Sequence, residues 1–274
     1  MNIDGATRLY AIIGDPVVQV RSPSVYTAHF GQSGINAVMV AAQASRDAFD
    51  TAMRGLMSLA NLDGLLITSP HKAAALAFAD HLSTRARIVG AVNAVRREPD
   101  GSWAGDMFDG IGFVSAAQRV APIEGKRARV FGCGGAGAAI AAELAARGAR
   151  SLALVDPDTQ RAQALRNALA DHFPACDVRT GNDGAACDIV VNASVVGMNE
   201  GDGLPGDPGA ICADSLVDDV VLRPPGTSTA LVKLARQAGA HVVTGQDMHA
   251  GQVDAILDFF ASAKPVETLD KGGR

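Results

Sequence analysis

The amino-acid sequence predicts an α/β protein with two domains. Short apolar runs alternate with amphipathic stretches along most of the chain, and this alternation is typical of β/α units. A glycine-rich turn lies near the middle of the chain, between an apolar run and a helical stretch. The length of 274 residues is sufficient for two domains of ordinary size.

The first part of the chain is expected to form successive strand and helix units. Apolar runs that end in turn residues indicate strands, and Ser-Pro pairs indicate helix starts, with serine as the N-cap and proline at the first helical position. We predict strands at residues 8–14, 37–43 and 64–68, helices from Ser22-Pro23, from about Ser45 to Ala60 and from near Ser69-Pro70, and a hairpin at residues 91–106 that turns at Pro99-Asp100-Gly101.

The glycine-rich turn belongs to a predicted strand–turn–helix–strand unit at residues 128–158. Gly132, Gly134 and Gly137 have the G-x-G-x-x-G spacing, which permits a tight turn, lets a pyrophosphate approach the backbone and packs the helix against the strand. The first N–H groups of the helix would then face the phosphates. Asp156 ends the next apolar run, where a ribose-binding carboxylate is expected. An ordinary βαβ unit with a glycine-rich turn is the alternative.

The rest of the chain continues the alternation of strands and helices. Residues 199–210 are rich in Gly, Asp and Pro and are expected to form a loop. The other predicted elements are helices at residues 109–120, 159–173 and 228–239 and from about Asp247, and strands at residues 187–194, 214–222 and 240–245.

Composition and charge argue against several classes of function. A net charge of −5 and a pI near 5.6 leave no positive footprint for nucleic acid or an anionic membrane. The N-terminal residues show no basic-then-apolar leader, and no apolar run reaches about 18 residues. The four cysteines show no C-x-x-C spacing, and the six histidines form no ligand-spaced cluster. We therefore expect a cytoplasmic protein with reduced thiols and no metal.

Several short motifs occur in a fixed order from about residue 12 to residue 252. They are GDPVVQVRSP, ITSPHK, GAVNAV, GDMFDGIGF, GCGGAG, VVNASVVGM and GQDMHAGQ. Together they resemble the shikimate/quinate dehydrogenase family. The resemblance implies an α/β substrate-binding and catalytic domain at residues 1–110, a Rossmann dinucleotide-binding domain at residues 111–246, and a final helix within residues 247–274 that returns to the first domain. It also implies reversible hydride transfer between a ring hydroxyl and a nicotinamide cofactor.

The resemblance assigns the catalytic roles to Lys72 and Asp109. By residue pattern alone, Lys72 would be a solvated lysine and Asp109 a helix N-cap. Lys72 matches the lysine of the family's T-x-P-x-K motif, and Asp109 matches the aspartate that partners it. Oxidation of an alcohol needs a group that takes its proton as the hydride leaves. Because a nearby carboxylate favours protonated lysine, the sequence leaves open whether Lys72 is the base or a donor to the developing oxyanion.

Four further residues match substrate-binding positions of the family, namely Ser22, Thr68, Asn93 and Gln252. Three of the four have a simpler alternative. Ser22 would also serve as a helix cap, and Asn93 as a turn or strand-edge asparagine. Gln252 interrupts the apolar stripe of the last helix, where a substrate hydroxyl would satisfy it, or it lies at the exposed edge of that stripe.

The resemblance also assigns the cofactor-binding residues. They are Gly132, Gly134, Gly135, Ala136, Gly137 and Asp156, with Ser194, Gly245 and Met248 near the nicotinamide.

Cofactor preference is predicted from the residues that follow the second strand of the unit. NADP-using members carry Asn-Arg-Thr where this chain has Asp156-Pro157-Asp158, so the arginine that would hold a 2′-phosphate is absent. A carboxylate suits the ribose hydroxyls of NAD and repels a phosphate. We predict NAD over NADP, with Arg161 as the residue best placed to oppose this preference.

The chain departs from the family at positions that face the substrate. Val20, Leu66 and Leu222 replace a serine, an asparagine and a tyrosine, and Met107-Phe108 replaces Asn-Thr. His71 replaces an aromatic residue; an exposed or capping histidine is expected there, with an acid–base role as the alternative.

Lost polar groups weaken substrate binding, because each good hydrogen bond contributes about 0.5–1.5 kcal/mol. We predict a divergent enzyme with weak or altered activity on shikimate. The alternatives are a dehydrogenase for an amino analogue and a non-catalytic NAD- or metabolite-binding regulator. The expected ligand is a small cyclic hydroxy acid, and the expected assembly is a monomer or homodimer.

Overall fold

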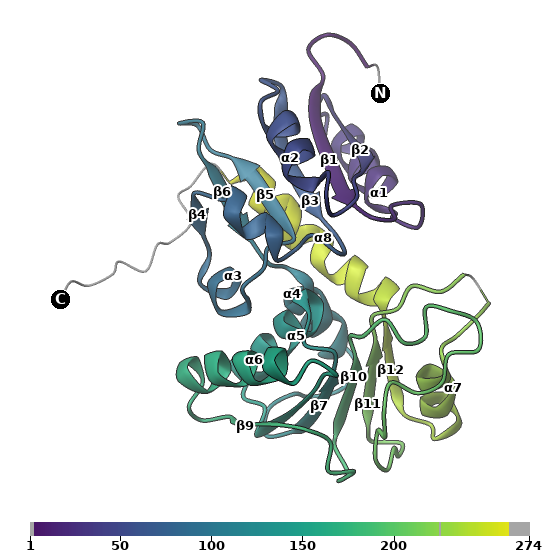
Figure 1. Cartoon of the computed structure of the whole chain (residues 1–274). Coiled ribbons are helices and arrows are strands. Elements are labelled where there is room, and N and C mark those ends of the chain that lie inside the picture. Colours follow the sequence, from purple (N-terminus) through teal and green to yellow (C-terminus); the bar gives the residue numbers. More distant parts are fainter. Residues whose placement is uncertain (1–2, 225, 263–274) are drawn as a thin grey trace, which may run out of the picture. The chain divides into compact units, whose positions relative to one another are not determined.

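A computed structural model describes residues 3–224 and 226–262 of the chain. The chain divides into two compact units, whose elements are labelled in Figure 1. The first unit holds the residues up to Met107 and the chain from Ile256 onward, and the second holds Phe108–Ala255. We expected the chain to divide after residues 110 and 246; in the structure it divides after Met107 and inside the last helix. Among the described residues, no helix combines the length and apolar character that a membrane span requires.

The first unit contains a mixed six-stranded sheet with the order β2-β1-β3-β5-β6-β4. β1 pairs in parallel with β2 and β3, and β5 pairs antiparallel with β3 and β6. The predicted hairpin at residues 91–106 therefore forms the β5–β6 pair. The strands are β1 (Arg8–Gly14), β2 (Ala37–Gln43), β3 (Leu62–Ile67), β4 (His81–Leu82), β5 (Ala94–Arg97) and β6 (Trp103–Asp106).

The helices of the first unit differ from the predictions at their starts. The predicted helix from Ser69-Pro70 is wrong, because Ser69 accepts a hydrogen bond from Asp15 N–H at 3.0 Å and helical turns begin only at Ala74. The Ser22 cap is also wrong: Ser22 lies inside its helix, and the N-cap residue is Arg21. The elements are α1 (Ser22–Gln32), α2 (Phe49–Met57), the 3₁₀ helix η1 (Ala74–Phe78) and α3 (Thr84–Val89).

The second unit contains six parallel strands with the order β12-β11-β10-β7-β8-β9. The strand order reverses between β7 and β10, which is the doubly wound Rossmann arrangement in which ligands bind beyond the carboxyl ends of the strands. The strands are β7 (Arg127–Phe131), β8 (Ser151–Val155), β9 (Asp177–Thr180), β10 (Ile189–Asn192), β11 (Leu216–Asp219) and β12 (His241–Thr244).

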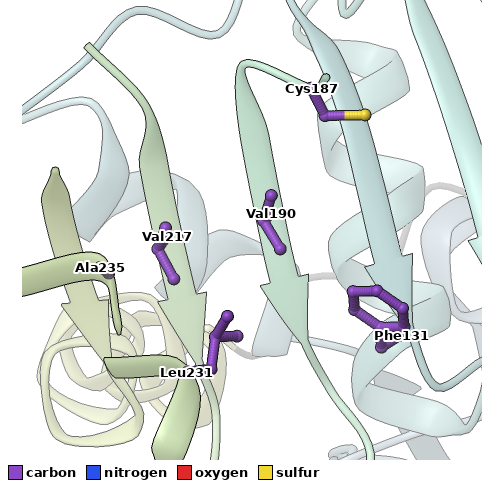
Figure 2. Packing of buried hydrophobic residues seen from close by; sticks show 6 residues of the cluster. All are labelled: Phe131, Cys187, Val190, Val217, Leu231 and Ala235. Atoms are coloured by element: carbon purple, nitrogen blue, oxygen red, sulfur yellow. The ribbon is translucent and has the colours of Figure 1, made fainter. Parts of the chain in front are cut away.

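Helices pack against this sheet through aliphatic side chains. Figure 2 shows one such cluster, in which Leu231 and Ala235 of α7 lie against Val190 and Val217 of the sheet, with Phe131 and Cys187 beside them. Burial of an aliphatic side chain of this size contributes about 1.5–3 kcal/mol. The helices are α4 (Asp109–Ala117), α5 (Gly135–Ala146), α6 (Thr159–His172), α7 (Ala230–Gln237) and α8 (Gly245–Ala261).

Two glycines bring α4 into close contact with its neighbours. A Cβ at Gly110 would lie 2.3 Å from the carbonyl oxygen of Ala139 in α5, and one at Gly112 would lie 2.3 Å from that of Met248 in α8. Helix backbones can approach this closely only where no side chain separates them. The glycines of the DGIGF motif are therefore explained by helix packing within the second unit.

The last turns of α8 belong to the first unit. Phe260 lies 4.9 Å from Tyr10 between ring centroids and occupies the space above Gly64. The buried guanidinium of Arg96 donates to the carbonyl of Phe259 at 2.5 Å and to Glu98 at 2.8 Å. A side chain from β5 thus fixes the end of the helix to the first unit's sheet.

Candidate active site

The glycine turn follows β7 and has the geometry that its spacing predicts. Gly132 has φ +91°, a conformation that residues with a Cβ rarely adopt. A Cβ at Gly137 would lie 1.8 Å from the carbonyl oxygen of Gly132, so helix α5 is packed directly on the turn. At Gly134, nothing lies within 4 Å of the Cβ position. The turn is therefore tightly packed at Gly132 and Gly137 and open at Gly134.

The open side of the turn leads to the amino end of α5. Gly134 is the N-cap residue, and Gly135, Ala136 and Gly137 form the first turn of the helix, where N–H groups lack partners inside the helix. Such a terminus attracts anions. Burial, with a further contribution from Asp156, raises the pKa of the Cys133 thiol to about 12, so no thiolate opposes a phosphate here. These residues fit the pyrophosphate of a dinucleotide.

Asp156 directly follows β8 and is hydrogen-bonded to the glycine turn. Its carboxylate accepts the N–H of Cys133 at 2.7 Å and that of Asp158 at 2.8 Å, and its side chain is 3% exposed. Arg161 lies 3.5 Å from Asp156 and 3.1 Å from Asp158. The two carboxylates and one guanidinium have a net charge of −1 in the region where a ribose is expected.

Ser194 lies across the topological switch point from the glycine turn. A Cβ at Gly132 would meet the carbonyl of Ala193 at 2.7 Å, so the loops after β7 and β10 are in contact. Asn192 organises the second loop: it accepts from the Ser194 hydroxyl at 2.7 Å and donates to the carbonyl of Val196 at 2.9 Å. Asn192 is not among the predicted site residues, although a polar residue at the end of a buried strand is a usable signal.

Three further predicted residues, Gly245, Met248 and Gln252, lie on α8. Gly245 is its first residue and follows β12, and Met248 is buried with its carbonyl beside Gly112. Gln252 is 8% exposed and packs next to Gly112. The alternative of an exposed stripe edge for Gln252 is therefore wrong.

The first unit gathers three of the predicted residues by backbone pairing. The carbonyl of Lys72 accepts the N–H of Val92 at 3.0 Å, and the carbonyl of Asn93 accepts the N–H of Ile67 at 2.8 Å. Thr68 directly follows Ile67 at the carboxyl end of β3. Asn93 is buried, and Thr68 and Lys72 are partly exposed. The segments that carry these residues are thus adjacent at the carboxyl end of β3.

His71 is a core residue rather than an exposed or capping one. It is 2% exposed, its ring stacks on Phe49 with 4.2 Å between centroids, and its Nε2 lies 2.7 Å from the carbonyl of Ala44. The expectation of a solvent-facing histidine is wrong because the ring packs on Phe49 at the start of α2. Its backbone N–H donates to Thr68 at 3.0 Å, so His71 anchors the segment before Lys72.

Two other predicted polar residues are buried at helix starts. Ser22 is 4% exposed at the first position of α1. Asp109 is 3% exposed at the first position of α4, where Phe108 is the N-cap, so the capping alternative for Asp109 is wrong. Lys72 lies in the first unit and Asp109 in the second.

The family departures have different surroundings. Leu66 is 5% exposed within β3, whereas Leu222 is 42% exposed after β11. Val20 is partly exposed before α1. Met107 and Phe108 are both buried.

Among the described residues, no three His, Cys, Asp or Glu side chains are grouped to hold a metal ion.

Comparison with known proteins places the chain in a family. Residues 12–95 match the shikimate dehydrogenase substrate binding domain. The chain is 39% identical to the shikimate dehydrogenase (NADP(+)) of Rubrobacter xylanophilus over 254 residues, which covers 90% of this chain and 88% of the relative. The chain belongs to the shikimate dehydrogenase family.

Solved structures of the family have the same fold. The shikimate 5-dehydrogenase of Listeria monocytogenes, in complex with shikimate and NAD, is 25% identical with a TM-score of 0.84, over 97% of this chain and 95% of that one. The quinate dehydrogenase of Corynebacterium glutamicum, in complex with NAD, is 28% identical with a TM-score of 0.80, over 95% of both chains. The predicted α/β architecture and family are confirmed, and this chain is an NAD(P)-dependent oxidoreductase of the shikimate dehydrogenase type.

Proposed function

We propose that the chain catalyses reversible hydride transfer between NAD and a ring hydroxyl of a shikimate- or quinate-like cyclic hydroxy acid. The observation that carries the proposal is that Thr68, Lys72 and Asn93, which match family positions, lie on adjacent segments at the carboxyl end of β3. The second unit supports it with a glycine turn that fits a dinucleotide.

In this proposal each polar residue has one role. Lys72 takes the proton of the reacting hydroxyl or donates to the developing oxyanion, and Asp109 is the second catalytic residue. Ser22, Thr68, Asn93 and Gln252 bind the carboxylate and the other hydroxyls. When bound, the nicotinamide accepts or supplies the hydride. The first-turn N–H groups of α5 and the carboxylate of Asp156 hold the pyrophosphate and ribose.

The departures from the family indicate weak or altered activity on shikimate. Val20 and Leu222 offer no hydrogen bonds where the family has polar groups, and buried Leu66 offers an apolar contact. We expect kcat/KM for shikimate to stay below about 10⁴ M⁻¹s⁻¹, the low end of typical enzymes. Steady-state kinetics with shikimate, quinate and an amino analogue test this. A value well above that limit with shikimate would contradict the proposed divergence, and no turnover with any of them would contradict the proposed activity.

We expect at least a tenfold higher kcat/KM with NAD than with NADP. A phosphate about 4 Å from an unpaired carboxylate costs about 1 kcal/mol in water and 4 kcal/mol at an effective dielectric constant of 20, and 1.4 kcal/mol is tenfold. Asp156 and Asp158 outnumber Arg161 at this position. The relative from Rubrobacter xylanophilus is named for NADP(+), so the preference needs a direct measurement.

A matched variant tests the physical cause of this preference. Asp158 accepts the N–H of Arg161 at 3.0 Å as the cap of α6, and serine at this position keeps a capping oxygen while removing the charge. Asp158→Ser should raise kcat/KM with NADP about five- to tenfold and leave that with NAD within about twofold. Equal efficiency of the unmodified enzyme with both cofactors would overturn the NAD preference.

A further inference from the structure

A hollow of about 720 Å³ lies at the amino-terminal edge of the second unit's sheet. Arg127, Ser151 and Asp177 begin β7, β8 and β9 and lie side by side in register. Arg150, directly before β8, and Arg166 of α6 complete the hollow together with Arg179 of β9. The hollow is thus built from three neighbouring strand starts and one helix.

The lining of this hollow is strongly positive. Four arginines and one aspartate line it, which gives the lining a charge of +3 in a chain whose net charge is −5; the carboxylates of Asp188 and Asp183, which pair with two of the arginines, reduce the local charge to +1. Concentrated positive charge on an acidic protein attracts anions to that place rather than to the surface as a whole. The guanidinium group in particular matches the paired oxygens of phosphate and carboxylate groups.

Two of the four arginines have no carboxylate partner among the described residues. Arg127 pairs with Asp188 at 3.3 Å, and Arg179 pairs with Asp183 at 3.4 Å. Arg166 instead donates to the carbonyl of Val178 at 3.2 Å and to the amide oxygen of Asn167, also at 3.2 Å. These neutral partners hold its guanidinium in place and leave its charge uncompensated.

Arg150 is the second unpaired arginine. Within residues 3–224 and 226–262 its side chain forms no ion pair, whereas its backbone N–H and carbonyl bond to Lys126 and Asp177. Ser151, the next residue along the chain, also lines the hollow. An anion here would be bound by two uncompensated guanidinium groups, with Asp177 as the opposing charge in the lining.

This hollow is separate from the dinucleotide site. The glycine turn follows the carboxyl end of β7, and the hollow lies at its amino end. β7 spans five residues, Arg127–Phe131, so the two ends are about 13 Å apart at 3.3 Å per residue. The four arginines therefore have no role in holding the cofactor at the turn.

We propose that this hollow is a second anion site, which binds a small polyanion carrying phosphate or carboxylate groups, independently of the dinucleotide. Arg150 and Arg166 are its principal ligands. Because a ligand that binds only the folded state stabilises it, the anion raises the thermal stability of the protein.

Calorimetric titration of the full chain with pyrophosphate tests the proposal. The titration is performed at low ionic strength with and without saturating NAD, and sodium chloride at matched ionic strength is the salt control; a parallel titration with citrate distinguishes phosphate from carboxylate ligands. Arg150→Glu should weaken pyrophosphate binding at least tenfold, and the milder Arg150→Gln should weaken it less. Arg236→Glu on α7 makes the same charge change elsewhere in the unit and should change the affinity less than twofold.

Three results would overturn the proposal. They are heats no larger than those with sodium chloride, equal weakening by Arg150→Glu and Arg236→Glu, and displacement of pyrophosphate by NAD. The first would leave the hollow without a ligand, the second would indicate diffuse attraction, and the third would place the anion at the glycine turn. A thermal melt of each variant confirms that it is folded before titration.

Discussion

Lys72→Ala lowers kcat for oxidation of the cyclic hydroxy acid by about 10²–10⁴-fold, the usual contribution of a general acid–base group. KM for the hydroxy acid changes little, because the lost interaction is made mainly in the transition state. The partly exposed lysine follows the buried His71, whose stacking on Phe49 fixes the segment independently of the Lys72 side chain. The fold therefore tolerates the change, and steady-state kinetics under saturating NAD measure it.

Lys233→Ala provides the matched control. Lys233 is an exposed lysine of α7, so its removal tests the loss of one positive charge without loss of the proposed site. Its kcat should stay within about twofold of the unmodified enzyme. Asp109→Asn should also lower kcat, and the double variant should lose less than the product of the two effects, because residues that serve the same chemical step have non-additive effects.

The Lys72→Ala variant also distinguishes an enzyme from a non-catalytic binding regulator. Unchanged turnover in Lys72→Ala would refute its catalytic role. A chain that binds NAD with normal affinity, turns over none of the three substrates and shows no effect of Lys72→Ala would favour the non-catalytic alternative.

Asp218→Val raises the free energy of unfolding, and the gain grows with pH. Asp218 is fully buried on β11, paired in register with Val191 of β10 and Val243 of β12. Neither of its carboxyl oxygens has a hydrogen-bond partner among the described residues. A buried polar group without a partner costs about 1–3 kcal/mol in proteins, and valine fills the position between two valines without that cost.

The pH dependence follows from the direction of the pKa shift. Burial raises the pKa of Asp218 well above its usual value, and the charges of Asp219 and Asp247 raise it further. The nearby backbone N–H of Asp219 acts in the opposite direction, but only weakly, because it forms no hydrogen bond with the carboxyl group of Asp218. Above the unfolded-state pKa the folded state holds one proton more than the unfolded state, so stability falls by about 1.4 kcal/mol per pH unit until the folded carboxyl ionises. Asp218→Val removes this slope.

Urea unfolding at several pH values between 5 and 9 measures the effect. Asp214→Asn is the control, because Asp214 is an exposed carboxylate shortly before the same strand and should change stability by less than about 0.5 kcal/mol. Asp183 does not interfere: the N–H of Ala185 is the main cause that lowers its pKa, so its contribution to stability is lost only in acid. An Asp218→Val profile parallel to that of the unmodified protein would show that Asp218 is ionised in the fold.

The sequence predicted those elements whose pattern is local. The dinucleotide unit was recognised because β7, the glycine turn, α5 and β8 follow one another with fixed spacing. The helix predicted at residues 159–173 is also local in its pattern: α6 buries Ala162, Leu165 and Leu169, which recur at helical spacing.

Features that depend on distant partners were missed or misplaced. β9 contains one buried residue in four, Val178, and exists only because it pairs with β8 at the sheet edge. His71 was expected at the surface because its contact with Phe49 joins segments that are distant in sequence. The unpartnered carboxyl of Asp218 was hidden because a single aspartate interrupts an apolar strand without indicating which face is buried.

The two glycines of α4 affect how distant relatives should be recognised. Both are required by the close approach of α4 to α5 and α8, and neither position leaves room for a side chain. A protein that has lost its chemistry but kept this architecture would still need them, so the two glycines of DGIGF indicate the architecture and not the activity. The activity of a remote homologue should instead be judged from whether a lysine occupies the position of Lys72.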